Sequence, residues 1–295
     1  MSETAATNLR QANASVEVAG IVSSKDLKFD QKDGSKVITG SVYVEIDETN
    51  IVRFGVYAKE KTNKGESNPA YQGLLTVMNE YRTIADNGRE HADKVYVKGD
   101  LSPYVAQNGK EAVSQKASFF NRVQKIENYS PKAEFEVEVY IASLVPEVDK
   151  EGTETGRLLV KGWVPTYSGI EPITLVAPED LAESIQNMFE ADQTVEFSGD
   201  LINNRVEIRT EIPMAIGKPK IKTETSYKNE LRITGASEAY EEGVTAEKPY
   251  DKETIRLAIN EHKAKQEAKQ REANSGNTAS YTRPSASGTG RQMSW

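Results

Sequence analysis

Three short apolar stretches in the first half of the sequence each contain a tyrosine, and two of them also contain basic side chains. VITGSVYVEI (37–46) contains one tyrosine, IVRFGVYA (51–58) an arginine and a tyrosine, and KVYVK (94–98) a tyrosine between two lysines. Flat rings stack on nucleobases at about 1–3 kcal/mol per base, and cations beside them bind phosphates. This combination of residue types is suited to holding a single strand of nucleic acid.

Strand alternation decides which of these side chains a ligand could reach. Inward-facing Val42 and Val44 turn Tyr43 outward, and inward-facing Val52, Phe54 and Val56 leave the arginine and tyrosine between them outside. The predicted binding face then carries Tyr43, Arg53, Tyr57, Lys94, Tyr96 and Lys98, bordered by Lys116 and Arg122 on the last strand and by Tyr104 in a hairpin. For any one of these residues the alternative is a purely structural role, because outward tyrosines beside lysines also occur on solvated sheet faces that bind nothing.

An octapeptide recurs in the two halves of the chain, as KVYVKGDL at 94–101 and TVEFSGDL at 194–201, and its surroundings recur as well. The first-half pattern predicts strands at 15–24, 37–46 and 51–58, a helix at 74–86, and strands at 94–101 and near 112–126. The second-half pattern predicts strands at 135–146, 157–167 and 171–178, a helix at 178–191, and strands at 194–201 and 205–212. Asp33-Gly34 and Asn108-Gly109 are typical of hairpin turns.

Three strands, a helix and two strands is the order of the OB-fold, a small Greek-key barrel. Residues 15–127, with VYVKGDL after the helix and a polar Asn-Gly turn, resemble the bacterial and phage single-stranded DNA-binding proteins, and residues 133–235 share the pattern of elements. The resemblance implies a mainly β protein of two tandem OB-like five-stranded Greek-key barrels, each with one helix. The chain departs from the family in having two units and in ending with RQMSW in place of an acidic tail.

The expected organisation has five parts. They are a flexible N-terminus at 1–14, an OB-fold domain at 15–130 that holds the main binding site, a second OB-like domain at 131–245, a C-terminal helix at 246–272, and a disordered tail at 273–295. The segment ELRITG (230–235) is a further strand that either completes the second barrel or crosses between the two.

The second unit has a weaker case for nucleic-acid binding. Alternation turns Lys161 and Trp163 outward, and an exposed tryptophan would be a stacking platform. However, residues 131–250 carry 23 acidic against 12 basic side chains, and an acidic surface repels phosphate. We therefore expect the first unit to be the main binding module, and the second unit or the tail to contact replication or recombination proteins.

Catalysis and metal binding have little support in the sequence. There is no cysteine, and the two histidines lie in polar stretches. Neither a phosphate-binding G-x-x-x-x-G-K-[ST] loop nor a G-x-G-x-x-G turn is present. We expect no cofactor, no metal and no enzymatic activity. No apolar run is long enough to span a membrane, so we expect a cytoplasmic protein, in the host cytoplasm if it is encoded by a phage.

The leading hypothesis is a non-catalytic, sequence-tolerant single-stranded DNA-binding protein acting in phage DNA replication or recombination. One alternative is an OB-fold protein-interaction module, either a replication adaptor or an inhibitor that mimics the charge of DNA. Another is an OB-fold RNA binder.

Overall fold

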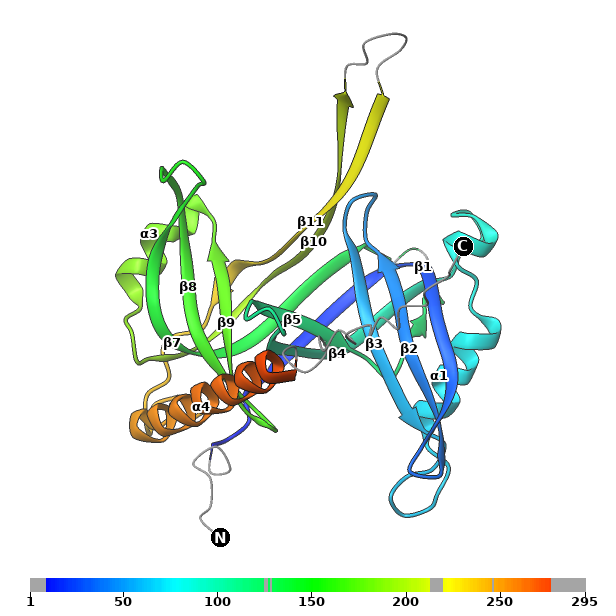
Figure 1. Cartoon of the computed structure of the whole chain (residues 1–295), viewed down its shortest axis with the longest axis horizontal. Coiled ribbons are helices and arrows are strands. Elements are labelled where there is room, and N and C mark those ends of the chain that lie inside the picture. Colours follow the sequence, from blue (N-terminus) through cyan, green and yellow to red (C-terminus); the bar gives the residue numbers. More distant parts are fainter. Residues whose placement is uncertain (1–8, 125–126, 128, 213–219, 246, 277–295) are drawn as a thin grey trace, which may run out of the picture.

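The computed structural model describes residues 9–124, 127, 129–212, 220–245 and 247–276. Its strands are β1 (Ala14–Lys32), β2 (Ser35–Glu45), β3 (Ile51–Lys59), β4 (Lys94–Val105), β5 (Glu111–Lys116), β6 (Asn121–Arg122), β7 (Lys132–Val148), β8 (Glu154–Thr166), β9 (Gly169–Ala177), β10 (Thr194–Ile212) and β11 (Lys220–Ala236). Its helices are α1 (Pro69–Glu80), α2 (Ile84–Asn87), α3 (Glu179–Met188) and α4 (Lys252–Gly276). In the first half, β1 to β6, the strands β2 and β3 and helix α1 lie to the right in Figure 1, and in the second half, β7 to β11, the strands β7, β8 and β9 and helix α3 lie to the left.

The strands β1 to β11 belong to one hydrogen-bonded sheet in the order β10-β11-β9-β8-β7-β1-β2-β3-β5-β4-β6. With the additional pairings of β1 with β4 and of β7 with β10, five strands of each half form a ring of hydrogen-bonded neighbours, which we call a circuit. The first circuit is β1-β2-β3-β5-β4, and the second is β7-β8-β9-β11-β10. Two residue pairs link β3 to β5, and one pair links β11 to β9. The mainly β architecture is confirmed. The prediction of two separate closed barrels is not confirmed. The pairing of β1 with β7 joins both halves in one sheet, and only a short bridge closes the ring of strands in each half.

The strand register relates the two halves residue by residue. Asp100 lies opposite Lys116, and Asp200 lies opposite Arg232. Gly99 of β4 pairs with Val16 of β1, just as Gly199 of β10 pairs with Phe135 of β7. Where β1 and β7 pair with each other, Val16 lies opposite Phe135, so corresponding residues of the two halves meet. Such self-complementary pairing is typical of a two-fold interface.

A volume exchange supports this correspondence. A Cβ atom on Gly20 of β1 would lie 2.6 Å from Cγ1 of Val44 on β2. At the corresponding pair in the second half, Gly162 is on β8 and Val139 is on β7, and a Cβ on Gly162 would come closer than 3.0 Å to Val139 Cγ1. Each half therefore has one valine beside one glycine, on opposite strands, and a Cβ on either glycine would also lie closer than 3.0 Å to a backbone carbonyl oxygen, of Glu45 or of Tyr140.

The repeated Gly-Asp-Leu has a steric cause. A Cβ on Gly99 would lie closer than 3.0 Å to the carbonyl oxygen of Lys116, and a Cβ on Gly199 equally close to that of Arg232. Because the obstacle is backbone, no side-chain rotation relieves it. The leucines that follow, Leu101 and Leu201, are both buried. Glycine thus allows β4 to cross β5 closely and β10 to cross β11 closely, and the leucine that follows is part of the core.

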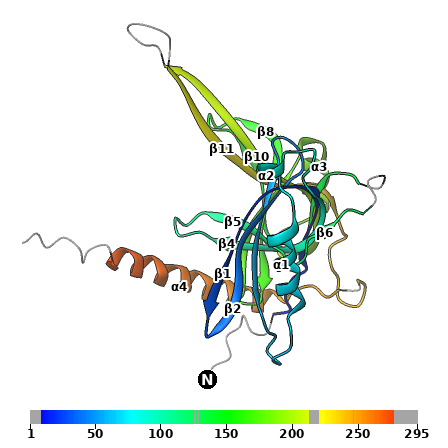
Figure 2. The ribbon, with the colours of Figure 1, turned by 90° about the vertical axis from the view of Figure 1, so that its right-hand side faces the viewer.

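Several predicted elements have different bounds. The segment 205–212 is not a separate strand, because β10 runs unbroken from Thr194 to Ile212. Its hairpin partner is β11, which includes ELRITG and completes the second circuit. The β10–β11 hairpin extends well beyond the rest of the molecule (Figures 1 and 2). Both predicted turn glycines, Gly34 and Gly109, have positive φ angles, which confirms those turns.

The first predicted helix, 74–86, is instead two helices separated by extended residues. The α1 helix begins one turn earlier than expected, where the Asn68 side chain accepts a hydrogen bond from the backbone N–H of Ala70 and Pro69 follows. At its other end, the Lys25 ammonium donates to the carbonyls of Val77, Met78 and Tyr81. A strand lysine therefore satisfies the carbonyls that end α1. The predicted C-terminal helix, 246–272, is observed as α4 at Lys252–Gly276.

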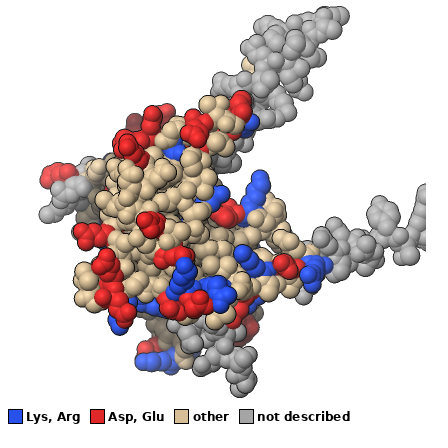
Figure 3. All heavy atoms as spheres, turned by 90° about the vertical axis from the view of Figure 1, so that its left-hand side faces the viewer, with Lys and Arg blue, Asp and Glu red and all other residues tan. Residues whose placement is uncertain are grey.

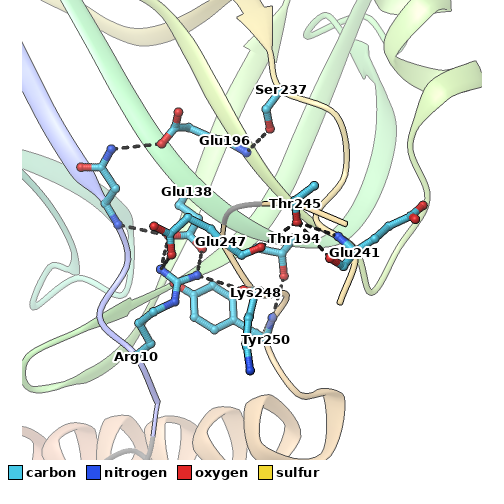
Figure 4. Close-up of polar contacts among 11 residues, drawn as sticks. Arg10, Glu138, Thr194, Glu196, Ser237, Glu241, Thr245, Glu247, Lys248 and Tyr250 are labelled. Carbon is cyan, nitrogen blue, oxygen red and sulfur yellow. Dashed lines mark hydrogen bonds and ion pairs between the residues drawn. The ribbon is translucent and has the colours of Figure 1, made fainter. Parts of the chain in front are cut away.

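The N-terminal segment and the approach to α4 are fastened to the second half by the charged cluster in Figure 4. Glu138 on β7 is almost completely buried and accepts two hydrogen bonds from the Arg10 guanidinium, which also lies 4.8 Å over the Tyr250 ring. Arg10 also donates to the carbonyl of Lys248, at 3.1 Å. From residue 9 onward, the segment 1–14 is therefore held in place, although we expected it to be flexible. Residues 1–8 and most of the expected tail, 277–295, lie outside the described residues.

Candidate functional site

Two adjoining hollows lie on the outer face of β3 and β5 in the first half, and we call them together the first-half groove. One, of about 500 Å³, is lined by Tyr43, Arg53, Tyr104 and Lys116. The other, of about 730 Å³, is lined by Tyr57, Lys98, Lys116 and Phe119. The structure thus brings six of the predicted residues to one surface, namely Tyr43, Arg53, Tyr57, Lys98, Tyr104 and Lys116.

Gly55 and Lys116 line both hollows and so join them. They pair across the parallel bridge between β3 and β5. A Cβ added to Gly55 would meet nothing closer than the Gln115 carbonyl oxygen at 3.7 Å, which is an ordinary contact. Gly55 is therefore not required by packing. Its missing side chain leaves the floor of the groove open at the point where the two hollows meet.

The aromatic rings of the groove are accessible from solvent. Tyr57 is 45% exposed, Tyr104 is 43% exposed and Phe119 is 50% exposed. They come from β3, from β4 and from the segment after β5, so the β3–β5 bridge and the β4–β5 hairpin place them around one surface. Exposed rings distributed in this way offer π-faces to a ligand that approaches along the groove.

The cations of the groove are only lightly committed to the protein. The Arg53 Nε donates to Ser41 Oγ at 3.0 Å, and the Lys98 ammonium lies 3.2 Å from a Glu17 carboxylate oxygen. Within the described part of the chain, no hydrogen bond or ion pair holds the Lys116 ammonium. An exposed ion pair such as Lys98–Glu17 contributes about 1 kcal/mol or less, so an anionic ligand can compete for the lysine.

Three predicted residues lie away from the groove, where the start of β4 pairs with β6. The Lys94 ammonium lies 4.9 Å from the centre of the Tyr129 ring, and the Tyr96 ring meets the same ring edge-on. Arg122 lies over the Tyr81 ring and forms ion pairs with Asp93 and Glu80. Lys94, Tyr96 and Arg122 are therefore not among the residues that line the first-half groove.

The corresponding surface of the second half is smaller and has a different charge. Its hollow is about 330 Å³, and no lysine or arginine is among the described residues that line it. Glu111 of β5 and Glu230 line it, and Glu230 forms ion pairs with Arg157 and Arg232. Val176 takes the place of Gly55, opposite Arg232 in the parallel bridge, and is buried. The β4–β5 hairpin of the first half also lies against it, with Thr174 Oγ1 donating to Glu111 at 2.8 Å. The two copies of one surface have therefore diverged.

Lys161 and Trp163 do not join the groove. Lys161 is exposed on the second half, where it corresponds to Tyr43. Trp163 is half-buried rather than exposed as predicted, because α4 crosses this face and the His262 ring meets the indole at a centroid distance of 5.6 Å. Alternation placed the indole correctly on the outer face, but the docking of α4 on that face could not be deduced from it.

Acidification is expected to weaken this docking. Burial lowers the pKa of His262, so the unfolded chain binds the proton more readily and stability is lost as the pH falls through the ordinary histidine range near 6.5. Burial raises the pKa of neighbouring Glu171, which acts in the opposite direction at lower pH, and Lys265 and Lys269 face both groups. Urea unfolding at pH 7.5 and 5.5 measures the effect, and His262→Gln removes it. If His262→Gln lost as much stability between pH 7.5 and pH 5.5 as the wild type does, His262 would not be the cause of the loss.

Sequence patterns missed two features of the site. Phe119 lies in SFF (118–120), just after a short strand. Alternation with its buried neighbour Phe120 was the one signal that Phe119 is exposed. Asn203 and Asn229 form one wall, where the base of the β10–β11 hairpin meets β3 through Asn50, whose Nδ2 donates to the Leu201 carbonyl at 3.1 Å. A contact between residues so distant in sequence leaves no local signal.

The described residues show no cluster of three or more metal-ligating side chains placed to hold an ion. Among the same residues, no helix is long and apolar enough to cross a membrane.

Comparison with known proteins identifies the family of the chain. No curated protein sequence matches the chain. The wild-type single-stranded DNA binding protein from Thermus aquaticus is 10% identical, with a TM-score of 0.49 over 81% of this chain and 98% of that one. A deletion mutant of the same protein is also 10% identical, with a TM-score of 0.47 over 81% and 100%. The YorF family model matches residues 13–275. Because this match covers most of its length, the chain belongs to the YorF family.

Proposed function

We propose that this protein binds single-stranded DNA in the first-half groove, without catalysing a reaction. The observation that carries the proposal is the open surface around Gly55, where the exposed rings of Tyr57, Tyr104 and Phe119 lie among the cations Arg53, Lys98 and Lys116. Stacking rings and loosely held cations are the two elements that sequence-tolerant binding of single strands requires.

The same groups favour a single strand over a duplex. A ring stacks on a base only where the base face is free, and the bases of a duplex are already stacked on one another. The contacts are to base faces and phosphates, which every nucleotide has, so we expect little dependence on sequence. The groove has no charged carboxylate in its 500 Å³ part, and Asp100 lines the 730 Å³ part.

In this proposal each five-strand circuit is an OB-like unit that has diverged in role. The first circuit holds the strand. The second, with Val176 in place of Gly55 and with acidic side chains spread over its outer face (Figure 3), supports the first and contacts proteins. The cellular setting we propose is the protection of transient single strands during replication or recombination.

Fluorescence anisotropy with a labelled oligo-dT tests the proposal. We expect saturable binding at low salt, with the logarithm of the affinity falling against that of the salt concentration at a slope of about −2 for three cations. Replacing Tyr43, Tyr57 and Tyr104 together by alanine is expected to lower the affinity by two orders of magnitude or more, from about 1–3 kcal/mol per ring.

Phe29→Ala is the matched control, because Phe29 is a 59% exposed aromatic residue that lines neither hollow. Equal effects of the triple variant and of the control would contradict the assignment of the site. Absence of oligo-dT binding by the wild type would exclude the function, and matched RNA as competitor decides between DNA and RNA.

A further inference from the structure

A third hollow lies between the two halves of the molecule and opens into the first-half groove. It is about 580 Å³ in volume. One wall is the β4–β5 hairpin, with Tyr104 and Lys116, and the other is the β8–β9 turn, with Tyr167. Tyr104 and Lys116 also line the first-half groove, so a chain bound there can continue into the hollow without leaving the protein.

Tyr167 is a highly exposed aromatic residue that lines this hollow. Its residue is 96% exposed, so the ring contributes almost nothing to the core. The turn that carries it is nevertheless well held. Pro165, two residues before it, is buried and its carbonyl accepts a hydrogen bond from the Ala12 N–H at 2.9 Å, and Thr166 Oγ1 donates to the Gly169 carbonyl at 3.2 Å. A free aromatic ring on a fixed turn is preorganised for a stacking ligand.

Cations follow on the far side of Tyr167. Ser168 and Glu171 line both this hollow and a small one under α4, which is also lined by Lys265 and Lys269. Lys265 and Lys269 are exposed and lie one helical turn apart, on a face of α4 that approaches the β8–β9 turn. The first-half groove, Tyr167 and these two lysines therefore follow one another along the surface, with the carboxylates of Asp100 and Glu171 beside the path.

We propose that the bound strand leaves the first-half groove at Lys116, crosses between the halves, and stacks a base on Tyr167 before passing the lysines of α4. This extension rests on the proposed function, since it concerns the same ligand. It assigns the second half one contact with the strand, and places that contact at the β8–β9 turn and not at Trp163.

The test compares Tyr167→Ala and Tyr167→Phe with the wild type, using a short oligo-dT of about 8 nucleotides and a long one of about 25, within and beyond the span of one OB-like unit. Tyr167→Ala is expected to lower the affinity for the long oligonucleotide about 5- to 150-fold and to leave that for the short one unchanged. Tyr167→Phe keeps the π-face and is expected to bind as the wild type does. Because the ring is exposed, thermal unfolding should be unchanged in both variants.

Unchanged affinity of Tyr167→Ala for the long oligonucleotide would overturn the extension while leaving the first-half groove as the binding site. An equal loss for both lengths would also overturn it, because Tyr167 would then belong to the primary site. A wild-type protein that binds neither oligonucleotide would exclude the proposed function together with its extension.

Discussion

Replacing Gly99 or Gly199 by alanine is expected to lower the free energy of unfolding by about 3 kcal/mol or more, a large part of the stability of an ordinary domain. The new methyl group would lie closer than 3.0 Å to the carbonyl oxygen of Lys116 or Arg232. The backbone of β5 or β11 would have to move away, and this would break the hydrogen bonds that pair it with β4 or β10. Urea unfolding of the two variants measures the loss.

Gly55→Ala is the matched control for this prediction. Gly55 is also a strand glycine opposite Lys116, but its added Cβ would meet nothing closer than 3.7 Å. We expect its stability to equal or exceed that of the wild type, because alanine restricts the unfolded chain. If Gly99→Ala were as stable as Gly55→Ala, close crossing of the strands would not explain the repeated Gly-Asp-Leu.

Replacing Gly55 by valine is expected to abolish most single-strand binding without unfolding the protein. Valine is the residue that the second half has at this position, as Val176, in the same type of parallel bridge. The strand backbone therefore accepts it, and β-branched residues favour strands. Its side chain would occupy the floor shared by the two hollows, between the rings and Lys116. We expect the affinity for oligo-dT to fall at least tenfold.

The reciprocal variant, Val176→Gly, shows whether any substitution at this position of the parallel bridge alters oligo-dT binding. It removes a buried valine from the second half and is expected to destabilise that half without altering oligo-dT affinity under conditions where the protein remains folded. The comparison requires circular dichroism spectra of both variants that match the wild type. If Gly55→Val bound as tightly as the wild type, the strand would not lie across Gly55.

Alternation allowed the face of each first-half strand to be predicted. Val42, Phe54 and Val97 are buried, whereas Arg53, Tyr57 and Lys98 are exposed, as the period of two requires. The repeated octapeptide indicated the duplication, because in both copies a nearby backbone carbonyl leaves no room for a side chain at the glycine, and the leucine is buried. Six of the eleven predicted binding residues consequently line one groove.

The remainder depends on contacts between distant segments, which leave no periodic signal. The pattern after Asp200 contains Asn203 and Asn204, which are typical of a turn, yet the strand continues because β11 pairs with it along its length. Trp163 has an outward position, but α4 arrives from almost one hundred residues later and covers it through His262. Lys94 and Arg122 point outward toward aromatic and acidic partners that lie elsewhere in the chain.

Photocrosslinking of an oligonucleotide containing 5-iododeoxyuridine, followed by identification of the modified residues, tests most directly whether the first-half groove holds a single strand. The account predicts crosslinks to the exposed groove aromatics Tyr57, Tyr104 and Phe119, and their loss in Gly55→Val. Crosslinks confined to the second half, or a pattern that Gly55→Val leaves unchanged, would contradict it.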